Sequence, residues 1–278
     1  MDRVNLFVIG VNKCGTNWLN HFLAQHPDVF MSKVKELNFF NDREPSPATI
    51  EEYHSHFPFE EDYQYFGEAS ARYYEDEKVA DKLKRYSPEA KLLAIVRDPI
   101  DRLVSQYRYH KQLGMLTENT TIEEALDGRD PALTRDSHYE NTLPAFTERF
   151  DSDQFQIVSL EEERGRPEAF WDRLISFLDL SYLPCPDPDP SPENPTGSAA
   201  YRRVYPATIR PIKSYAPSLY RRMLESDLVR QTKLGLIRLL GTAEPETLSS
   251  EQEERLRDEF APTYAYLKEL GFDVYDAG

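Results

Sequence analysis

The chain has 278 residues, a length that suits one large domain or one domain with a helical extension. Its formal net charge of −16 argues against nucleic acid and anionic membranes as partners, because long-range repulsion would oppose both. A hydrophobic fraction of 40 % is enough for a sizeable core, and the 17 Tyr and 15 Phe residues argue against a disordered chain.

The cysteines and the apolar runs restrict the class of protein further. The two cysteines, Cys14 and Cys185, have no CxxC or histidine partner at metal-binding spacing, so we expect no metal site. No apolar run approaches the ~20 residues that span a bilayer, and the first residues do not form a signal peptide. The sequence therefore predicts a soluble, cytoplasmic protein.

Strands and helices alternate along most of the chain. Short apolar and β-branched runs predict buried strands at residues 6–9, 29–31, 66–70, 91–96 and 155–160. Apolar residues at helical spacing predict helices at residues 16–25, 75–86, from 99 onward, 122–126, 139–150 and 168–178. This alternation indicates an α/β domain with a central, mainly parallel sheet flanked by helices.

The composition changes after the last predicted strand and helix. Six prolines fall within residues 184–195, a density that excludes a helix or a central strand. We expect one domain with an α/β core at 1–182, a proline-rich loop at 183–200 and a helical tail within 201–278. In that tail, Ser250 and Glu253 predict a capping box.

The segment GVNKCGTNWL, residues 10–19, joins the first predicted strand to the first predicted helix. A helix N-terminus offers backbone N–H groups and a positive dipole end, which together bind phosphate or sulfate. Gly10 and Gly15 allow a tight turn, Lys13 supplies a cation, and Thr16 can donate its hydroxyl. The segment is not a Walker A loop, because its lysine does not lie between a glycine and Ser or Thr. The alternative is an ordinary βα turn.

The segment KLLAIVRDPIDRLVSQY, residues 91–107, repeats the order of strand, loop and helix. Arg97 lies where the strand ends, and Ser105 lies eight residues later on the helix. The carboxyl end of a strand faces the ligand crevice of an open α/β sheet, and a guanidinium there can bind phosphate oxygens. The alternative is that Arg97 merely pairs with Asp98 or Asp101.

Together these two segments resemble the sulfotransferase family that uses 3′-phosphoadenosine 5′-phosphosulfate (PAPS), in the branch with heparan sulfate sulfotransferases and many bacterial enzymes. The first is similar to that family's 5′-phosphosulfate loop and the second to its 3′-phosphate segment. The blocks HPDVFMSKVKELNFF, FGEASARYY, FQIVSLEEE and FWDRLISFLDL resemble further family blocks in the same order. The resemblance covers nearly the whole chain and implies a P-loop-like sulfotransferase fold.

The resemblance implies a role for each motif residue. Lys13 would contact the bridging oxygen and the 5′-phosphate, and Arg97 and Ser105 would hold the 3′-phosphate. Glu36, in KELNFF, matches the carboxylate that acts as catalytic base. The implied donor-binding set is Lys13, Cys14, Gly15, Thr16, Asn17, Trp18, Arg97, Ser105, Arg202 and Arg203.

Some positions depart from the family pattern. Arg203, with its neighbour Arg202, would belong to a late loop that closes over the 3′-phosphate and adenine. That loop has Tyr201 and Arg202 where a Lys-Gly pair is common. Ala69 stands where a lysine is usual, and Asn38 where histidine is frequent. These departures concern the acceptor side and loop closure.

The implied reaction is an in-line transfer of a sulfuryl group from PAPS to a hydroxyl or amine, which releases adenosine 3′,5′-bisphosphate (PAP) without a metal. The acceptor would be a small molecule, a glycan or a glycolipid. Residues 43–65 and 112–138 are expected to shape its pocket, with His54 and His56 as bases alternative to Glu36.

Two rival functions are a P-loop nucleotide kinase or other phosphotransferase, and a non-catalytic nucleotide-binding module. The first would need a Gly-Lys-Ser/Thr loop and an acid at a strand end for magnesium, and the sequence shows neither convincingly. If donor binding is correct, Lys13, Arg97, Arg202 and Arg203 should form a basic cleft on an otherwise negative surface.

Overall fold

The computed structural model describes residues 3–117, 119–129, 131–186 and 248–272. These residues form two compact units, each assembled from separate segments of the chain. The first unit contains the sheet and comprises the described residues of 3–98, 138–186 and 262–272. The second comprises those of 99–137 and 248–261. The single domain that the sequence suggests stays a prediction.

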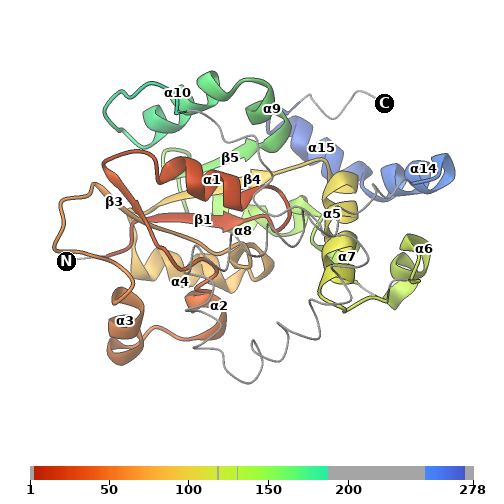
Figure 1. Cartoon of the computed structure of the whole chain (residues 1–278), viewed down its shortest axis with the longest axis horizontal. Coiled ribbons are helices and arrows are strands. Elements are labelled where there is room, and N and C mark those ends of the chain that lie inside the picture. The colour runs from red at the N-terminus through yellow and green to blue at the C-terminus, as the bar shows by residue number, and fades with distance from the viewer. Residues whose placement is uncertain (1–2, 118, 130, 187–247, 273–278) are drawn as a thin grey trace, which may run out of the picture. The chain divides into compact units, whose positions relative to one another are not determined.

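Five parallel strands form the sheet of the first unit, in the order β2-β3-β1-β4-β5 (Figure 1). The strands are β1 (Leu6–Gly10), β2 (Val29–Met31), β3 (Tyr65–Ala69), β4 (Lys91–Val96) and β5 (Phe155–Ser159). Every pair of neighbours is parallel, which confirms the predicted α/β class. The chain leaves β1 toward β2 but leaves β4 toward β5, so the strand order reverses between β1 and β4. Ligands of open α/β sheets bind at such a point, outside the carboxyl ends of the strands.

Helices occupy the connections of the first unit. They are α1 (Thr16–Leu23), α2 (Phe39–Asp42), α3 (Pro47–His54), η1 (Tyr73–Glu75), α4 (Lys78–Tyr86), η3 (Tyr139–Asn141), α8 (Leu143–Thr147), α9 (Leu160–Gly165), α10 (Pro167–Phe177) and α15 (Ala261–Glu269). Right-handed crossovers in opposite directions place α1 and α4 on opposite faces of the sheet. In Figure 1, α1 lies in front of the strands and α4 lies below them.

The second unit is helical in its described part. Its elements are α5 (Pro99–Gln112), α6 (Ile122–Glu124), η2 (Ala125–Arg129), α7 (Ala132–Arg135) and α14 (Ser250–Glu259). Arg102 is fully buried here and donates to Ser137 Oγ at 2.6 Å and to the Leu133 carbonyl at 2.7 Å. These bonds satisfy a charge that burial would otherwise penalise heavily.

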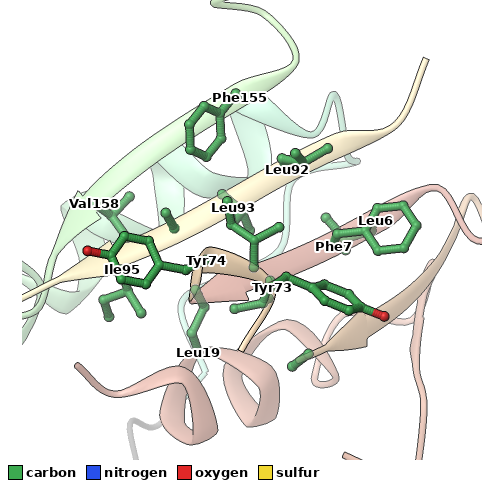
Figure 2. Close-up of a cluster of buried hydrophobic side chains, with 14 of the residues drawn as sticks. Leu6, Phe7, Leu19, Tyr73, Tyr74, Leu92, Leu93, Ile95, Phe155 and Val158 are labelled. Atoms are coloured by element: carbon green, nitrogen blue, oxygen red, sulfur yellow. The ribbon is translucent and has the colours of Figure 1, made fainter. Parts of the chain in front are cut away.

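The core follows from the apolar runs in the sequence. Every residue of β1 is buried, and β4 is buried after Lys91. Strands covered on both faces need such continuous apolar runs. Figure 2 shows side chains from these strands in one cluster with Tyr73 and Tyr74. The core holds the exits of β1 and β4 side by side, with Gly10 opposite Ala94 after a shift in register between Val8 and Gly10.

The predicted capping box is wrong by one residue. Ser249 is the N-cap of α14: its Oγ accepts from the Gln252 amide at 3.2 Å, and Gln252 Oε1 accepts from the Ser249 amide at 2.9 Å. The sequence SSEQEE offers a Ser with Glu or Gln three residues later in two registers. Two described helices, α14 and α15, confirm a helical C-terminal region. Most of the proline-rich loop lies outside the described residues.

Candidate active site

The loop after β1 turns into α1 through residues in the left-handed backbone region. Lys13 has φ 73° and Gly15, the N-cap of α1, has φ 101°. A Cβ at Gly15 would lie 2.9 Å from Leu160 Cδ1, so both the dihedral angle and the space require glycine. Gly15 has no side chain to cap the helix. The first amides of α1 therefore receive no side-chain cap from Gly15, and amides at a helix N-terminus are groups that can bind an anion.

Tyr139 connects this loop to the exit of β4. It is fully buried on η3, and its hydroxyl donates to the Arg97 carbonyl at 2.9 Å. Cys14 Sγ lies 3.5 Å from the same hydroxyl oxygen. Since a phenol has one proton, only the Cys14 thiol can donate in that contact, and the Asn12 carbonyl, 3.9 Å from Sγ, is a second acceptor for the same thiol proton. One side chain thus fixes the two predicted anion-binding loops to each other.

The side chain of Cys14 cannot touch a ligand. It is fully buried, and the Cys14 amide donates to the Val11 carbonyl at 3.1 Å. Its predicted role in donor binding would therefore be indirect, through the shape that Cys14 gives the loop.

Arg97 pairs with a residue that the sequence did not single out. Its Nε lies 3.6 Å from Glu161 Oε1, and the same carboxylate oxygen accepts from the Asp98 amide at 3.4 Å. Glu161 is the second residue of α9, which begins directly after β5, so it lies at the same edge of the sheet as Arg97. Its position at the end of a predicted strand was the available signal. The carboxylate of Asp98, proposed above as a partner, accepts from Tyr264 at 2.9 Å.

Glu36 follows β2 and is held by its backbone and its side chain. Its amide donates to the Ala69 carbonyl at 3.0 Å, and its Oε2 accepts from the Ala71 amide at 3.1 Å. The residue is exposed to solvent, but the protein atoms around its carboxyl group raise its pKa by desolvation. Lys35, the Ala71 amide and Arg72 act against that shift. Glu36 is therefore anchored rather than a freely moving surface charge.

Lys35 joins the Glu36 segment to the first turn of α1. Its Nζ donates to Asn17 Oδ1. This contact brings a second lysine beside the helix N-terminus that follows Lys13. Nothing local in KELNFF shows which way the Lys35 side chain turns, so the sequence alone gives no signal for this contact.

The other predicted donor-binding residues occupy varied places. Thr16 is buried at the start of α1. Trp18 stacks on Phe22, with ring centroids 5.0 Å apart, and packs at a tilt against Phe170, with centroids 5.2 Å apart. Ser105 is half-buried on α5, in the second unit. The two remaining members, Arg202 and Arg203, lie outside the described residues, so the predicted basic cleft is placed only in part.

A cavity of about 830 Å³ lies at the opposite edge of the sheet. His54 lines it and bonds with Tyr86 Oη at 2.7 Å, and Tyr86 precedes the start of β4. Arg3, which precedes β1, lines it too. A strand of five or six residues separates the two edges by roughly 15–20 Å. This part of the segment 43–65 therefore faces away from the exits of β1 and β4, and so does His54.

Within the described part of the chain, no group of three His, Cys, Asp or Glu side chains could hold a metal ion. No helix within the described ranges is long and apolar enough to cross a membrane.

Comparison with known proteins identifies the family. The sulfotransferase domain family matches residues 3–187. Mouse heparan sulfate glucosamine 3-O-sulfotransferase 5 is 31 % identical over 185 residues, which cover 62 % of this chain and 52 % of the mouse protein. The membrane-associated sulfotransferase kil1 of Dictyostelium discoideum is 34 % identical over 111 residues, covering 39 % of this chain and 23 % of that protein.

A solved sulfotransferase from Alicyclobacillus acidocaldarius has the same fold. It superposes with a TM-score of 0.59 at 23 % identity, over 80 % of this chain and all of that one. The chain belongs to the sulfotransferase domain family. It spans about half or less of the length of the curated relatives named above.

Proposed function

We propose that this protein transfers a sulfuryl group from PAPS to a hydroxyl or amine of an acceptor and releases PAP. The observation that carries the proposal is the Tyr139 bridge. It ties the loop after β1 to the exit of β4, at the point where the strand order reverses. Family membership supports the same reaction.

In this proposal the donor is held by positive charge and backbone amides. Lys13 and the N-terminus of α1 would bind the 5′-phosphosulfate and stabilise the charge that develops on the leaving phosphate. Arg97 would leave Glu161 for the 3′-phosphate, an exchange that its contact of 3.6 Å permits. The role of Ser105 in 3′-phosphate binding stays a prediction from the resemblance.

Glu36 would act as the base. The acceptor oxygen or nitrogen attacks sulfur in line with the bridging oxygen, the bond from sulfur to that oxygen breaks, and the acceptor proton passes to Glu36. Its Oε2 is already bonded to the Ala71 amide, so Oε1 would take the proton. The desolvation that raises its pKa makes it a stronger base than an ordinary surface glutamate.

The acceptor is proposed by class. A glycan, a glycolipid or a small molecule with a hydroxyl or amine fits the reaction, and the relative from mouse is named for heparan sulfate glucosamine. The net charge of −16 favours a neutral or weakly charged acceptor, because a long polyanion would be repelled on approach. A cytoplasmic location belongs to the proposal, and the free thiols of both cysteines suit it.

Transfer of labelled sulfate from PAPS to a panel of sugar and amine acceptors tests the reaction. Lys13→Ala should lower the rate at least about 100-fold, since it removes one preorganised charge from the transition state. Lys91→Ala is the matched control, because Lys91 begins β4 at the opposite edge of the sheet. Its rate should stay within about twofold of the wild type.

Nucleotide binding separates the proposal from its rivals. PAP should bind without magnesium and more tightly than ATP, and Lys13→Ala should weaken that binding. Tight magnesium-dependent binding of ATP would instead favour a kinase. Binding of PAP with no transfer to any acceptor would favour a binding module.

A further inference from the structure

Beneath the Glu36 segment lies a second carboxylate, on β3. Glu68 is 1 % exposed and accepts three hydroxyl donors: Tyr53 Oη at 2.9 Å, Tyr73 Oη at 2.5 Å and Ser70 Oγ at 3.1 Å. A buried carboxylate is tolerated only with such partners. Burial raises the pKa of Glu68 to about 7, while the three hydroxyls lower it.

Two of these hydroxyls continue to the backbone that carries Glu36. Ser70 Oγ accepts from the Asn38 amide at 3.0 Å, and Tyr73 Oη accepts from the Phe40 amide at 3.5 Å. Asn38 in turn donates from Nδ2 to the Glu36 carbonyl at 2.9 Å. The hydroxyl of Tyr53, the third donor, bonds to Glu68 and does not continue to that backbone.

The segment held in this way has an unfavourable backbone conformation. Glu36 has φ 56° and Asn38 has φ 51°, both in the left-handed region. A residue other than glycine persists there when its surroundings fix it. The hydrogen bonds that Ser70 and Tyr73 accept from the Asn38 and Phe40 amides supply that constraint. The Ala71 amide fixes the Glu36 carboxylate.

We propose that Glu68 is a positioning residue, which acts through Ser70 and Tyr73 to fix the backbone of residues 36–40 and hence the direction of the Glu36 carboxylate. This inference rests on the proposed function of Glu36 as the base. Glu68 itself is buried and does not touch the acceptor.

The three hydroxyls provide a matched set of variants. Ser70→Ala and Tyr73→Phe each remove one donor to Glu68 together with its link to residues 36–40. Tyr53→Phe removes a donor to Glu68 and leaves both links. We expect kcat for sulfuryl transfer to fall about tenfold in Ser70→Ala and in Tyr73→Phe, with an unchanged KM for PAPS, and to change less than about twofold in Tyr53→Phe.

Amide exchange measured by NMR tests whether these hydrogen bonds order residues 36–40, and the measurement does not depend on activity. The Asn38 amide should exchange at least about tenfold faster in Ser70→Ala and at the wild-type rate in Tyr53→Phe. Equal losses of kcat in all three variants, or faster exchange with unchanged kcat, would overturn the proposal. If the wild-type protein transfers no sulfuryl group, the proposed function fails. The Asn38 exchange rate in Glu68→Gln, which keeps the Ser70 acceptor, then decides whether Glu68 orders the segment.

Discussion

Glu36 and Glu68 are two carboxylates of one region with different environments. Both have a raised pKa because protein surrounds them, but only Glu36 has cationic neighbours, Lys35 and Arg72, that act against the shift. Glu68 depends on the neutral hydroxyls of Tyr53, Tyr73 and Ser70, and the charge of Glu36 raises its pKa further. A proton is therefore kept more readily by the buried carboxylate than by the proposed base.

The buried carboxylate should make stability depend on pH. Its pKa is raised from 4.5 to about 7 on folding, so its contribution is largest below pH 4.5 and is lost as pH rises through 7. Urea unfolding should show that the wild type loses about 2 kcal/mol relative to Glu68→Gln between pH 5 and pH 8.

Glu251→Gln, an exchange at an exposed position on α14, is the control for that measurement. It should reproduce the pH dependence of the wild type. Parallel curves for the wild type and Glu68→Gln would show that the Glu68 carboxyl group has the same pKa in the folded and unfolded states.

At the scale of elements, the exits of β1 and β4 are organised by a residue from a third connection. Tyr139 lies on η3, before β5, and binds both the Arg97 carbonyl and the Cys14 thiol. Glu161, after β5, binds the side chain of Arg97. The elements around β5 therefore position loops that belong to β1 and β4.

Tyr139→Phe should loosen both loops while it keeps the buried ring. The Arg97 carbonyl would lose its donor and the Cys14 thiol its acceptor, at a cost of about 1–3 kcal/mol in the free energy of unfolding. We expect the Kd for PAP, measured by calorimetry, to rise about threefold to tenfold. Tyr74→Phe is the matched control, because the Tyr74 hydroxyl donates to the His138 carbonyl at 3.4 Å. An equal rise in Kd for both variants would show that the Tyr139 hydroxyl does not specifically position the two loops.

At the scale of the whole molecule, the net charge of −16 opposes compaction of the chain. Three cations lie near the strand exits: Lys13, Lys35 and Arg97. They concentrate positive charge locally in a protein whose net charge is negative. Their position would let an acidic protein bind the strongly anionic donor that we propose.

Screening of that self-repulsion should be measurable. Raising NaCl from about 0.05 M to about 0.5 M shortens the Debye length from more than 10 Å to less than 5 Å, so the Tm at pH 8 should rise. The rise should be smaller at pH 5.5, nearer the isoelectric point of about 4.9, because less net charge remains to be screened. A Tm that falls with salt at pH 8 would show that favourable ion pairs outweigh the repulsion.

The sequence by itself determined the strands, their α/β class and the two loops at strand exits. Continuous apolar runs such as KLLAIV encode burial on both faces, and glycines between a strand and a helix encode the turn that joins them. Anion binding by that turn stays a prediction. These are local properties of periodicity and composition. The register of the capping box at Ser249 was mispredicted because two overlapping local patterns were equally good.

Only the tertiary structure decided which side chains meet. The partner of Arg97 is Glu161, the bridge between the loops is Tyr139, and the support of the Glu36 segment is Glu68 with its hydroxyls. Arg97 and Glu161 are 64 positions apart, and Cys14 and Tyr139 are 125 apart. Such contacts depend on strand order and on the reversal between β1 and β4, which no local pattern contains. The physical reason is that the sheet brings strand ends together in space, whatever their separation along the chain.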